Sequence, residues 1–396
     1  MARALLYLPE PAGRSLAARS VAGRSLTVRA LVSAFRAGAT LVVIPEALRD
    51  TAVDRALGRM PALAAAVRWL DPDRPDTPPA DGEPWLFVPV SAVVDAVSLR
   101  ALLTPEPPAQ GAALSGSAAA SAPVVLAPAN LAARLWKDAA ACRPLGPELA
   151  HHIAQAGLES REAPGVFAAV KDEAGLRRAE NALYRRVGID ADSGVDRLLH
   201  RRCSHWITRA LVRTPVTPNQ VSLLSFLIGC GSIWCFWDAS PVSAVWGLVL
   251  YTLACVVDHS DGELARLTFQ ESRFGAHLDW AIDNIIHAGV VFGIGLSAGG
   301  PVAIAIAIVA AVGVALSAWF ARILPHEIEV GEAVGGALKD MGNRDLFYLL
   351  LLGFVLFRWT APLLLLPLAV VVAVGSQAYW IGCVDRIRRS RAGGGS

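Results

Sequence analysis

Four aspartates follow one another closely in this chain, between segments that are otherwise strongly hydrophobic. They are Asp258, Asp261, Asp279 and Asp283. The first pair is spaced three residues apart and the second pair four, so on a helix each pair shares one face. Carboxylates beside hydrocarbon are costly unless cations neutralise them.

Oxygen ligands of this kind suit Mg²⁺, Mn²⁺ or Ca²⁺ better than zinc or copper. Two such ions held close together can clamp the attacking and leaving oxygens of a displacement at phosphorus. A structural salt-bridge network or a proton path would also place carboxylates in a membrane. The spacing therefore predicts a divalent-metal site for phosphoryl chemistry and leaves those two alternatives open.

Small residues and one arginine accompany the aspartates in a fixed pattern, D258-x-x-D261-G262-x-x-A265-R266-x8-G275-x3-D279-x3-D283. This pattern resembles the motif of the CDP-alcohol phosphotransferase family at every fixed position. The resemblance includes "TPN" before the first hydrophobic segment and extends from about Asp192 to Arg386.

The resemblance implies a metal-dependent transfer from a CDP-alcohol to an acceptor hydroxyl, with release of CMP. Asp258, Asp261, Asp279 and Asp283 would hold two Mg²⁺ or Mn²⁺ ions, and Asp283 would also be the general base. The residues expected at the CDP site are Asp258, Gly262, Ala265, Arg266 and Gly275. The family also implies a homodimer.

Three basic residues follow the motif at the ends of later hydrophobic segments, and they are Arg322, Lys339 and Arg344. Cations there could bind the phosphate of an acceptor such as inositol phosphate. The excess of basic residues in cytoplasmic loops would also explain them. Three nearby histidines, His259, His277 and His287, are interpreted as bystanders.

Six hydrophobic segments are predicted to cross a membrane, because a helix needs about 20 mostly apolar residues to do so. They are roughly Val221–Trp237, Val242–Val257, Ala276–Ala298, Val302–Ile323, Leu346–Phe357 and Ala361–Val384. Basic residues gather in one set of loops and in the tail, which predicts that both termini face the cytoplasm. The opening residues do not resemble a signal peptide, so we expect the front half to stay in the cytoplasm. The expected location of this multi-pass protein is the cell inner (plasma) membrane.

A basic amphipathic helix is predicted immediately before the first crossing. Apolar residues including Leu198, Leu199 and Trp206 recur at helical spacing, and arginines such as Arg202 and Arg209 fill much of the other face. Such a helix is typical of one lying on an anionic membrane surface, although an ordinary surface helix has the same pattern.

The front half alternates short apolar runs with charged residues and predicts an open α/β, Rossmann-like sheet. A helix over Leu26–Phe35, ended by Gly38, precedes the strand "TLVVIP". The fold resembles sugar-phosphate nucleotidyltransferases, and the layout is similar to bifunctional inositol-1-phosphate cytidylyltransferase/di-myo-inositol-phosphate-phosphate synthases. Pro9, Glu10 and Pro11 replace the expected phosphate-binding glycines, and Ser91 stands where a metal-binding Asp is expected. We therefore expect an inactive, degenerate domain.

These patterns divide the chain into residues 1–190 (degenerate α/β domain), 191–218 (juxtamembrane helix and turn), 219–386 (all-α six-helix membrane domain) and 387–396 (basic tail). The formal net charge of +2 argues against a nucleic-acid binder. The predicted function is an integral-membrane CDP-alcohol phosphotransferase that uses CDP-inositol or CDP-diacylglycerol and a polyol-phosphate or lipid acceptor. The alternative is a catalytically silent membrane scaffold, and an ion or proton transporter would not require the small residues of the motif.

Overall fold

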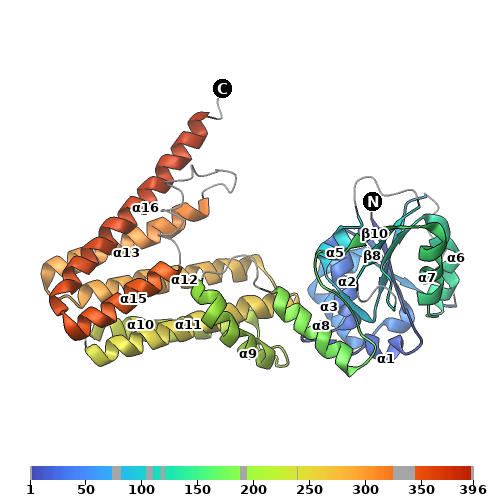
Figure 1. The fold of residues 1–396 in the computed structure, drawn as a ribbon, viewed down its shortest axis with the longest axis horizontal. Helices are drawn as coiled ribbons and strands as arrows, with labels where there is room; N and C mark the ends of the chain where they lie inside the picture. Colours follow the sequence, from blue (N-terminus) through green and yellow to red (C-terminus); the bar gives the residue numbers. More distant parts are fainter. Residues whose placement is uncertain are drawn as a thin grey trace. The chain divides into compact units, whose positions relative to one another are not determined.

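The computed structural model describes residues 2–73, 82–103, 110–116, 121–187, 194–238, 240–323 and 344–393. The chain divides into two compact units (Figure 1): Met1–Val187 with Leu267–Phe269, and Gly188–Arg266 with Gln270–Ser396. The first contains a mixed sheet with helices, and the described part of the second is helical. The prediction of a front half with strands and helices followed by a helical half is confirmed.

The first unit is built on a seven-stranded sheet with the order β10-β8-β9-β6-β1-β4-β5. Strand β9 runs antiparallel to both of its neighbours, and the other six strands are parallel. Arg3 of the central strand aligns with Leu41 on one side and Trp85 on the other. The strands of this sheet are β1 (Arg3–Tyr7), β4 (Leu41–Pro45), β5 (Val67–Leu70), β6 (Trp85–Pro89), β8 (Ala112–Ser115), β9 (Val125–Ala127) and β10 (Glu159–Glu162). Two small antiparallel pairs are β2 (Ser20–Val21) with β3 (Arg24–Ser25), and β7 (Ala92–Val94) with β11 (Phe167–Ala169).

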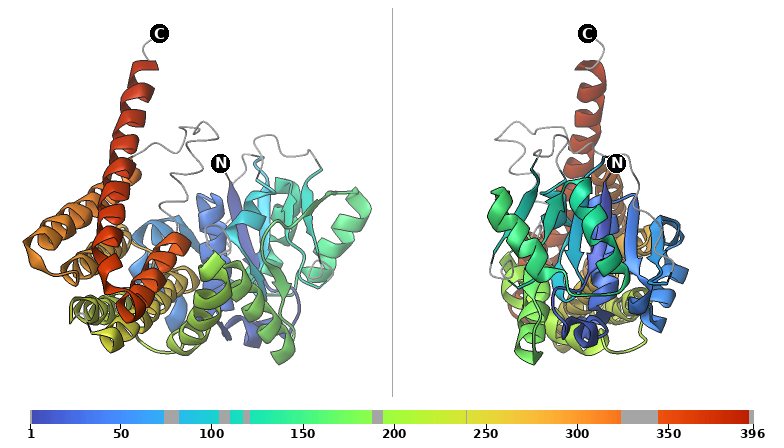
Figure 2. Two further views of the ribbon diagram at one scale, coloured as in Figure 1. Left: turned by 60° about the vertical axis from the view of Figure 1, so that its left-hand side comes forward. Right: turned by 90° about the vertical axis from the view of Figure 1, so that its right-hand side faces the viewer.

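Helices cover both faces of this sheet, as Figure 2 shows. Two separate apolar cores result, one on the side of α2 and one under α6 and α7. The helices and short helical turns are α1 (Gly13–Ala17), α2 (Leu26–Ala37), η1 (Glu46–Leu48), α3 (Thr51–Arg59), α4 (Pro61–Ala66), α5 (Ala96–Arg100), α6 (Ala129–Ala140), α7 (Gly146–Ala156) and α8 (Glu173–Arg186).

Helix α2 shows why the sequence prediction succeeded in this unit. The Ser25 side chain accepts a hydrogen bond from the Val28 backbone N–H and caps the start of the helix. Gly38 ends it with φ +113°, a conformation that favours glycine. The predicted helix and the strand that follows it are confirmed.

Arg29 of α2 is a buried cation inside the first unit. Its guanidinium donates to the carbonyl oxygens of Val21, Ala22 and Leu267 at 2.8–2.9 Å. Burial, together with the neighbouring Arg24, lowers the pKa of this guanidinium. The three carbonyls replace the water that the charge loses on folding.

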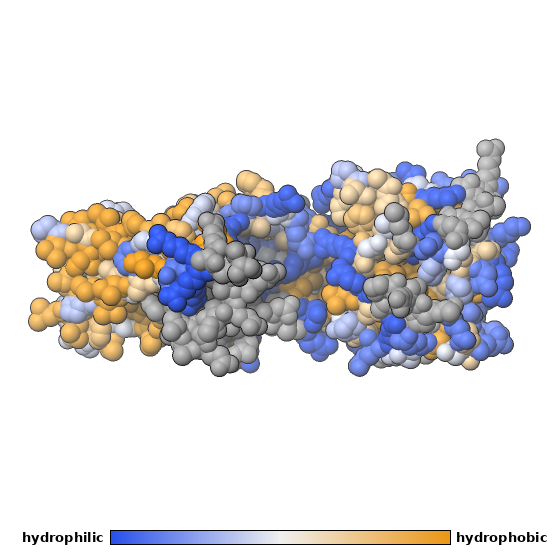
Figure 3. All heavy atoms as spheres, turned by 90° about the horizontal axis from the view of Figure 1, so that it is seen from above, coloured by the Kyte–Doolittle hydropathy of each residue, from blue (hydrophilic) through white to orange (hydrophobic). Residues whose placement is uncertain are grey.

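On the face seen in Figure 3, many hydrophobic side chains gather over the second unit, which consists mainly of long helices. They are α10 (Pro218–Asp238), α11 (Pro241–Thr268), α12 (Arg273–Leu296), α13 (Gly300–Ile323), α15 (Arg344–Thr360) and α16 (Leu365–Gly393), with the short turn η3 (Pro362–Leu364) before the last. Four stretches among the described residues are long and apolar enough to cross a membrane: Pro218–Asp238, Pro241–Thr268, Gly300–Ile323 and Pro362–Arg389. The predicted count of six crossings is therefore not confirmed, because α12 carries two aspartates and α15 has only 17 residues.

Glycines allow the helices of this unit to approach closely. A Cβ atom added to Gly229 would lie 2.4 Å from Ile286 Cδ1, and one added to Gly289 would lie 2.4 Å from Ile233 Cδ1. Small residues at helix contacts are typical of membrane proteins, where close packing has to replace the hydrophobic effect. These contacts hold α10 against α12, the helix that carries two of the four aspartates.

The juxtamembrane segment forms a π-helical turn, η2 (Asp196–His200), that continues into α9 (Arg201–Leu211). Its buried face is polar, since Asp196, His200, Ser204 and Thr208 recur every fourth residue and are all buried. Its apolar residues point outward instead, with Leu198 70% and Trp206 77% exposed. The predicted helix is confirmed, and its exposed apolar face is the one that a membrane surface would cover.

Candidate active site

Helices α11 and α12 carry the four aspartates at one end of the bundle. Helix α11 continues to Thr268, well beyond the predicted end at Val257, so Asp258 and Asp261 lie on its last turns. A short connection leads to α12, which starts at Arg273. Ser272 caps this helix, because its side chain accepts a hydrogen bond from the Gly275 backbone N–H. Asp279 and Asp283 therefore lie in the first turns of α12.

Three of the four carboxylates converge. Asp258, Asp261 and Asp279 each offer an oxygen, and these three atoms lie within 4.8 Å of one another. Asp258 and Asp261 are only 9% and 5% exposed, and Asp279 is half-buried. Asp283 is not in this group and lies one helical turn further along α12. A buried set of oxygen ligands fits a divalent cation of the Mg²⁺ type.

Helix α10 contributes a residue that the sequence prediction missed. The Ser222 hydroxyl donates a hydrogen bond to Asp261 Oδ2, and both side chains are buried. A hydrogen-bond donor at this position fixes the rotamer of the carboxylate. Ser222 lies four residues after the proline of "TPN", and a serine in a hydrophobic helix gave no signal of this role.

The glycines of the motif lie where other groups come close to the backbone. A Cβ atom at Gly262 would lie 3.3 Å from the Arg266 guanidinium, so this arginine folds back over the glycine. A Cβ atom at Gly275 would lie 3.3 Å from the side-chain oxygen of Asn219. Arg266 is exposed, and Ala265 is half-buried between these positions. Each glycine thus lets a polar side chain lie close to the backbone.

Glu263 is a second residue that the sequence prediction missed, although it lies inside the motif. It is fully buried, and its carboxylate accepts hydrogen bonds from Ser204 and Thr208 at 2.7 Å and from Arg201 at 3.0 Å. Around the helix axis, Glu263 lies roughly opposite Asp258 and Asp261. One side of α11 thus holds the carboxylate group, and the other side holds the juxtamembrane helix.

The three predicted acceptor cations are only partly described. Arg322 of α13 lies over the Trp280 ring, 4.6 Å from its centroid, which places it beside the aspartate-bearing part of α12. Lys339 lies outside the described residues. Arg344 is the first residue of α15, and its side chain lies outside what the structure describes.

Comparisons with known proteins show the family of the chain. The sequence pattern described as CDP-alcohol phosphatidyltransferase matches residues 215–375. A phosphatidylinositol phosphate synthase of Streptomyces avermitilis is 32% identical over 191 residues, which are 46% of this chain and 76% of that protein. The chain belongs to the CDP-alcohol phosphatidyltransferase family. The predicted resemblance is confirmed.

Two archaeal relatives match shorter stretches of the chain. A bifunctional IPC transferase and DIPP synthase of Archaeoglobus fulgidus is 32% identical over 112 residues, 28% of this chain and 22% of that protein. An archaetidylinositol phosphate synthase of Pyrococcus horikoshii is 36% identical over 90 residues, 23% of this chain and 46% of that protein. The chain thus spans less than half the length of these two relatives.

Members of this family generally depend on a divalent metal, and the carboxylate group of α11 and α12 offers suitable ligands. The neighbouring histidines are tied to the backbone, as their interpretation as bystanders requires. Nδ1 of His277 and of His287 lies 2.5–2.6 Å from a main-chain carbonyl four residues earlier. His287 also contacts the Tyr251 hydroxyl at 2.9 Å. His259 is different, because it contacts a carboxylate as well as a carbonyl.

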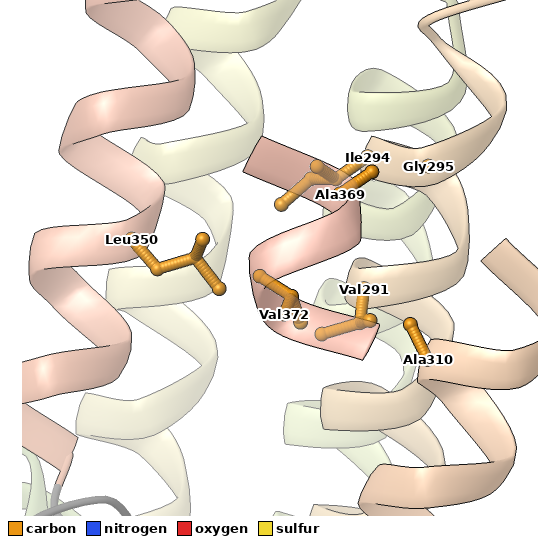
Figure 4. A pocket seen from close by; sticks show the side chains of 7 residues that line it. All are labelled: Val291, Ile294, Gly295, Ala310, Leu350, Ala369 and Val372. Atoms are coloured by element: carbon orange, nitrogen blue, oxygen red, sulfur yellow. The ribbon is translucent and has the colours of Figure 1, made fainter. Parts of the chain in front are cut away.

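A narrow apolar gap lies among α12, α13, α15 and α16 (Figure 4). Its lining consists of aliphatic residues and one glycine: Val291, Ile294, Gly295, Ala310, Leu350, Ala369 and Val372. Because it offers no hydrogen-bonding side chain, hydrocarbon is the only chemistry that it suits.

The first unit has a small pocket at the carboxyl ends of β1 and β6, where open α/β sheets bind ligands. Its lining includes Glu10, Gly13, Ser91 and Lys171. Lys171 Nζ lies 3.6 Å from Glu10 Oε1, so an acidic residue neutralises the cation that could otherwise meet a phosphate. The nucleotidyltransferase-like character predicted for this unit is not confirmed.

Proposed function

We propose that this chain is an integral-membrane CDP-alcohol phosphotransferase. It transfers a substituted phosphate from a CDP-alcohol to an acceptor hydroxyl, and CMP leaves. The observation that carries the proposal is the convergence of Asp258, Asp261 and Asp279 within the family's motif. A silent scaffold would not need two buried carboxylates and a half-buried one directed at one point.

Asp258, Asp261 and Asp279 would hold the metal ions, with Asp283 as a further ligand of the second. Two Mg²⁺ or Mn²⁺ ions bound here would neutralise the charge that builds on the donor phosphate. Asp283 would act as the general base that takes the proton of the acceptor hydroxyl. The new oxygen–phosphorus bond forms as the bond to the CMP oxygen breaks, and the departing CMP carries away the electron pair.

The donor would bind over a surface formed by the three small residues of the motif. Gly262, Ala265 and Gly275 leave room for a nucleotide close to the backbone, and Arg266 lies above Gly262 in position to meet a phosphate. Asp258 borders the same surface. A side chain larger than alanine at these positions would fill the space that the nucleotide requires.

An inositol phosphate is the acceptor that we would test first, because the Pyrococcus and Streptomyces relatives carry inositol phosphate in their names. The cations proposed to hold the acceptor phosphate are Arg322, Lys339 and Arg344. CDP-diacylglycerol is the favoured donor over CDP-inositol, since the Streptomyces relative, of which the largest share is matched, is a phosphatidylinositol phosphate synthase.

The proposed setting is the cell inner (plasma) membrane, crossed six times, with both termini in the cytoplasm and the chain paired as a homodimer. Helices α12 and α15 would then be the two further crossings beside the four more apolar ones. The first unit would serve folding, assembly or regulation rather than cytidylyl transfer.

The direct test is CMP release by the purified chain with Mg²⁺. CDP-diacylglycerol and CDP-inositol would each be supplied with and without inositol 1-phosphate or glycerol 3-phosphate. We expect CMP only when a donor and its acceptor are both present. Absence of CMP with every pair, from protein that binds CDP, would contradict the proposed function.

Two controls separate the proposed roles. Asp283→Asn should lower the rate by about 10²–10⁴-fold while CDP binding is retained, because only proton transfer and one ligand are lost. EDTA should stop the reaction, and Mg²⁺ or Mn²⁺ should restore it. A rate that survives EDTA would exclude the metal ligands as assigned.

A further inference from the structure

A second group of metal-ligating side chains lies on the other side of α11 from the aspartates. Asp196 and His200 come from the π-helical turn η2, and His259 comes from α11. Each offers one ligand atom, and the three atoms lie within 4.8 Å of one another. All three side chains are at least 94% buried.

The outward nitrogen of each imidazole has its own partner. His200 Nε2 lies 2.7 Å from the Tyr348 hydroxyl, and His259 Nδ1 lies 2.9 Å from the Cys255 carbonyl oxygen. Metal-ligating histidines characteristically bind the ion through one nitrogen and donate from the other to a carbonyl, carboxylate or water. Both rings here have this arrangement, and both direct their remaining nitrogen at Asp196 Oδ1.

The contact between His259 and Asp196 calls for a positive charge between them. A carbonyl oxygen can only accept, so His259 Nδ1 carries a proton. In a neutral ring Nε2 then has a lone pair, and it lies 3.2 Å from a carboxylate oxygen. Two lone pairs that face each other in a buried site need either a proton or a metal ion between them.

We infer that Asp196, His200 and His259 form a binding site for a transition-metal ion, with zinc as the favoured ion. A set of two imidazole nitrogens and one carboxylate oxygen binds Zn²⁺ in preference to Mg²⁺. This preference distinguishes the site from the group of aspartates, whose ligands are all carboxylate oxygens. His200 would bind through Nδ1 and donate from Nε2 to the Tyr348 oxygen. Water or the second oxygen of Asp196 would complete a tetrahedron.

Such an ion would have a structural role. It would join the juxtamembrane turn to α11 one residue away from Asp258. The same turn is held to α15 by Asp345, whose carboxylate accepts from the Gly194 and Val195 backbone N–H groups at 2.9 Å. The metal would therefore link η2 to α11, and the hydrogen bonds of Asp345 extend that link to α15, without any contact to the substrates.

The experiment measures metal content rather than activity. The full chain would be purified in detergent through a tag that contains no histidine, loaded with Zn²⁺ in the presence of excess Mg²⁺, and passed over a weak chelating resin. We expect elemental mass spectrometry to find about one zinc ion per chain. His200→Gln and Asp196→Asn should reduce that content at least tenfold.

Two matched variants show where the ion is bound. His287→Gln removes a histidine outside the site, and Asp279→Asn removes a carboxylate from the other group, so both should keep the zinc. Loading the wild-type chain with Co²⁺ should give visible absorption bands of a tetrahedral site, and this readout does not require a variant to fold. CMP release with Mg²⁺ on the same samples tests the proposed function separately.

The inference would be overturned if the wild-type chain keeps no more zinc than His200→Gln. Equal zinc in both, or Co²⁺ without visible bands, would mean that a proton alone joins His259 to Asp196. Loss of zinc in Asp279→Asn but not in His200→Gln would place the ion in the carboxylate group instead.

Discussion

Replacing Glu263 by alanine should destabilise the second unit more than any exposed substitution. The change leaves the Arg201 guanidinium, only 16% exposed, and two buried hydroxyls without the carboxylate that they bind. Removing one partner of a buried charged pair costs about 3–5 kcal/mol. Each kcal/mol lowers the melting temperature by about 2–4 °C in a unit of this size, so we expect a decrease of about 10 °C.

The assay is thermal unfolding in detergent at a fixed scan rate, followed by tryptophan fluorescence. Glu263→Gln should fall between wild type and Glu263→Ala, because the uncharged amide oxygen can still accept the two hydrogen bonds that Ser204 and Arg201 donate to one carboxylate oxygen. Glu271→Ala removes an exposed glutamate nearby and serves as the control.

Coupling to the juxtamembrane helix is tested with Ser204. Ser204→Ala should cost about 1 kcal/mol in the wild-type chain and almost nothing in Glu263→Ala, because the hydrogen bond is already lost. A Glu263→Ala protein that melts with the wild type would refute the reasoning. Fully additive effects of the two substitutions would refute the proposed contact.

Three further outcomes are expected. Gly295→Ala should destabilise the second unit by about 1–3 kcal/mol, because the new Cβ would lie 2.5 Å from Ala307 Cβ. The control Gly353→Ala places its Cβ where nothing lies within 4 Å and should be neutral or stabilising, so equal melting temperatures of the two variants would contradict this reasoning. Arg29→Met should lower the stability of the first unit by about 3 kcal/mol, since three buried carbonyls lose their donor, and unchanged resistance to proteolysis would argue against it. Arg322→Ala should raise the KM for a phosphorylated acceptor by about tenfold and leave the KM for the CDP donor unchanged, and the reverse pattern would assign this arginine to the donor.

The parts of the fold that the sequence predicted are those set by local chemistry. The stripe of α2, its serine cap and Gly38 all act within one helix, so their pattern is visible in a single stretch. The four aspartates were visible for the same reason, because spacing within a helix decides which carboxylates share a face. Hydropathy found the apolar helices but not the end of α11, since its last turns are polar and still helical.

The parts that the sequence did not predict depend on partners far along the chain. Ser222 becomes a ligand-positioning group only because α10 packs beside Asp261. The polar stripe of the juxtamembrane helix reads as its solvent face, yet Ser204 and Thr208 are buried against Glu263. In a membrane protein the buried face of a helix can be the polar one, and periodicity alone cannot show which face is buried.

The outer strand β10 has a consequence for the behaviour of many copies in one membrane. Anchored proteins are confined to two dimensions, where collisions between the same surfaces recur far more often than in free solution. An uncovered strand of a sheet offers backbone groups that a neighbouring copy could pair with. Strand β10 reads Glu-Ser-Arg-Glu, and Arg161 pairs with Glu159 at 2.7 Å along it. This charged border should keep crowded copies from joining strand to strand along β10.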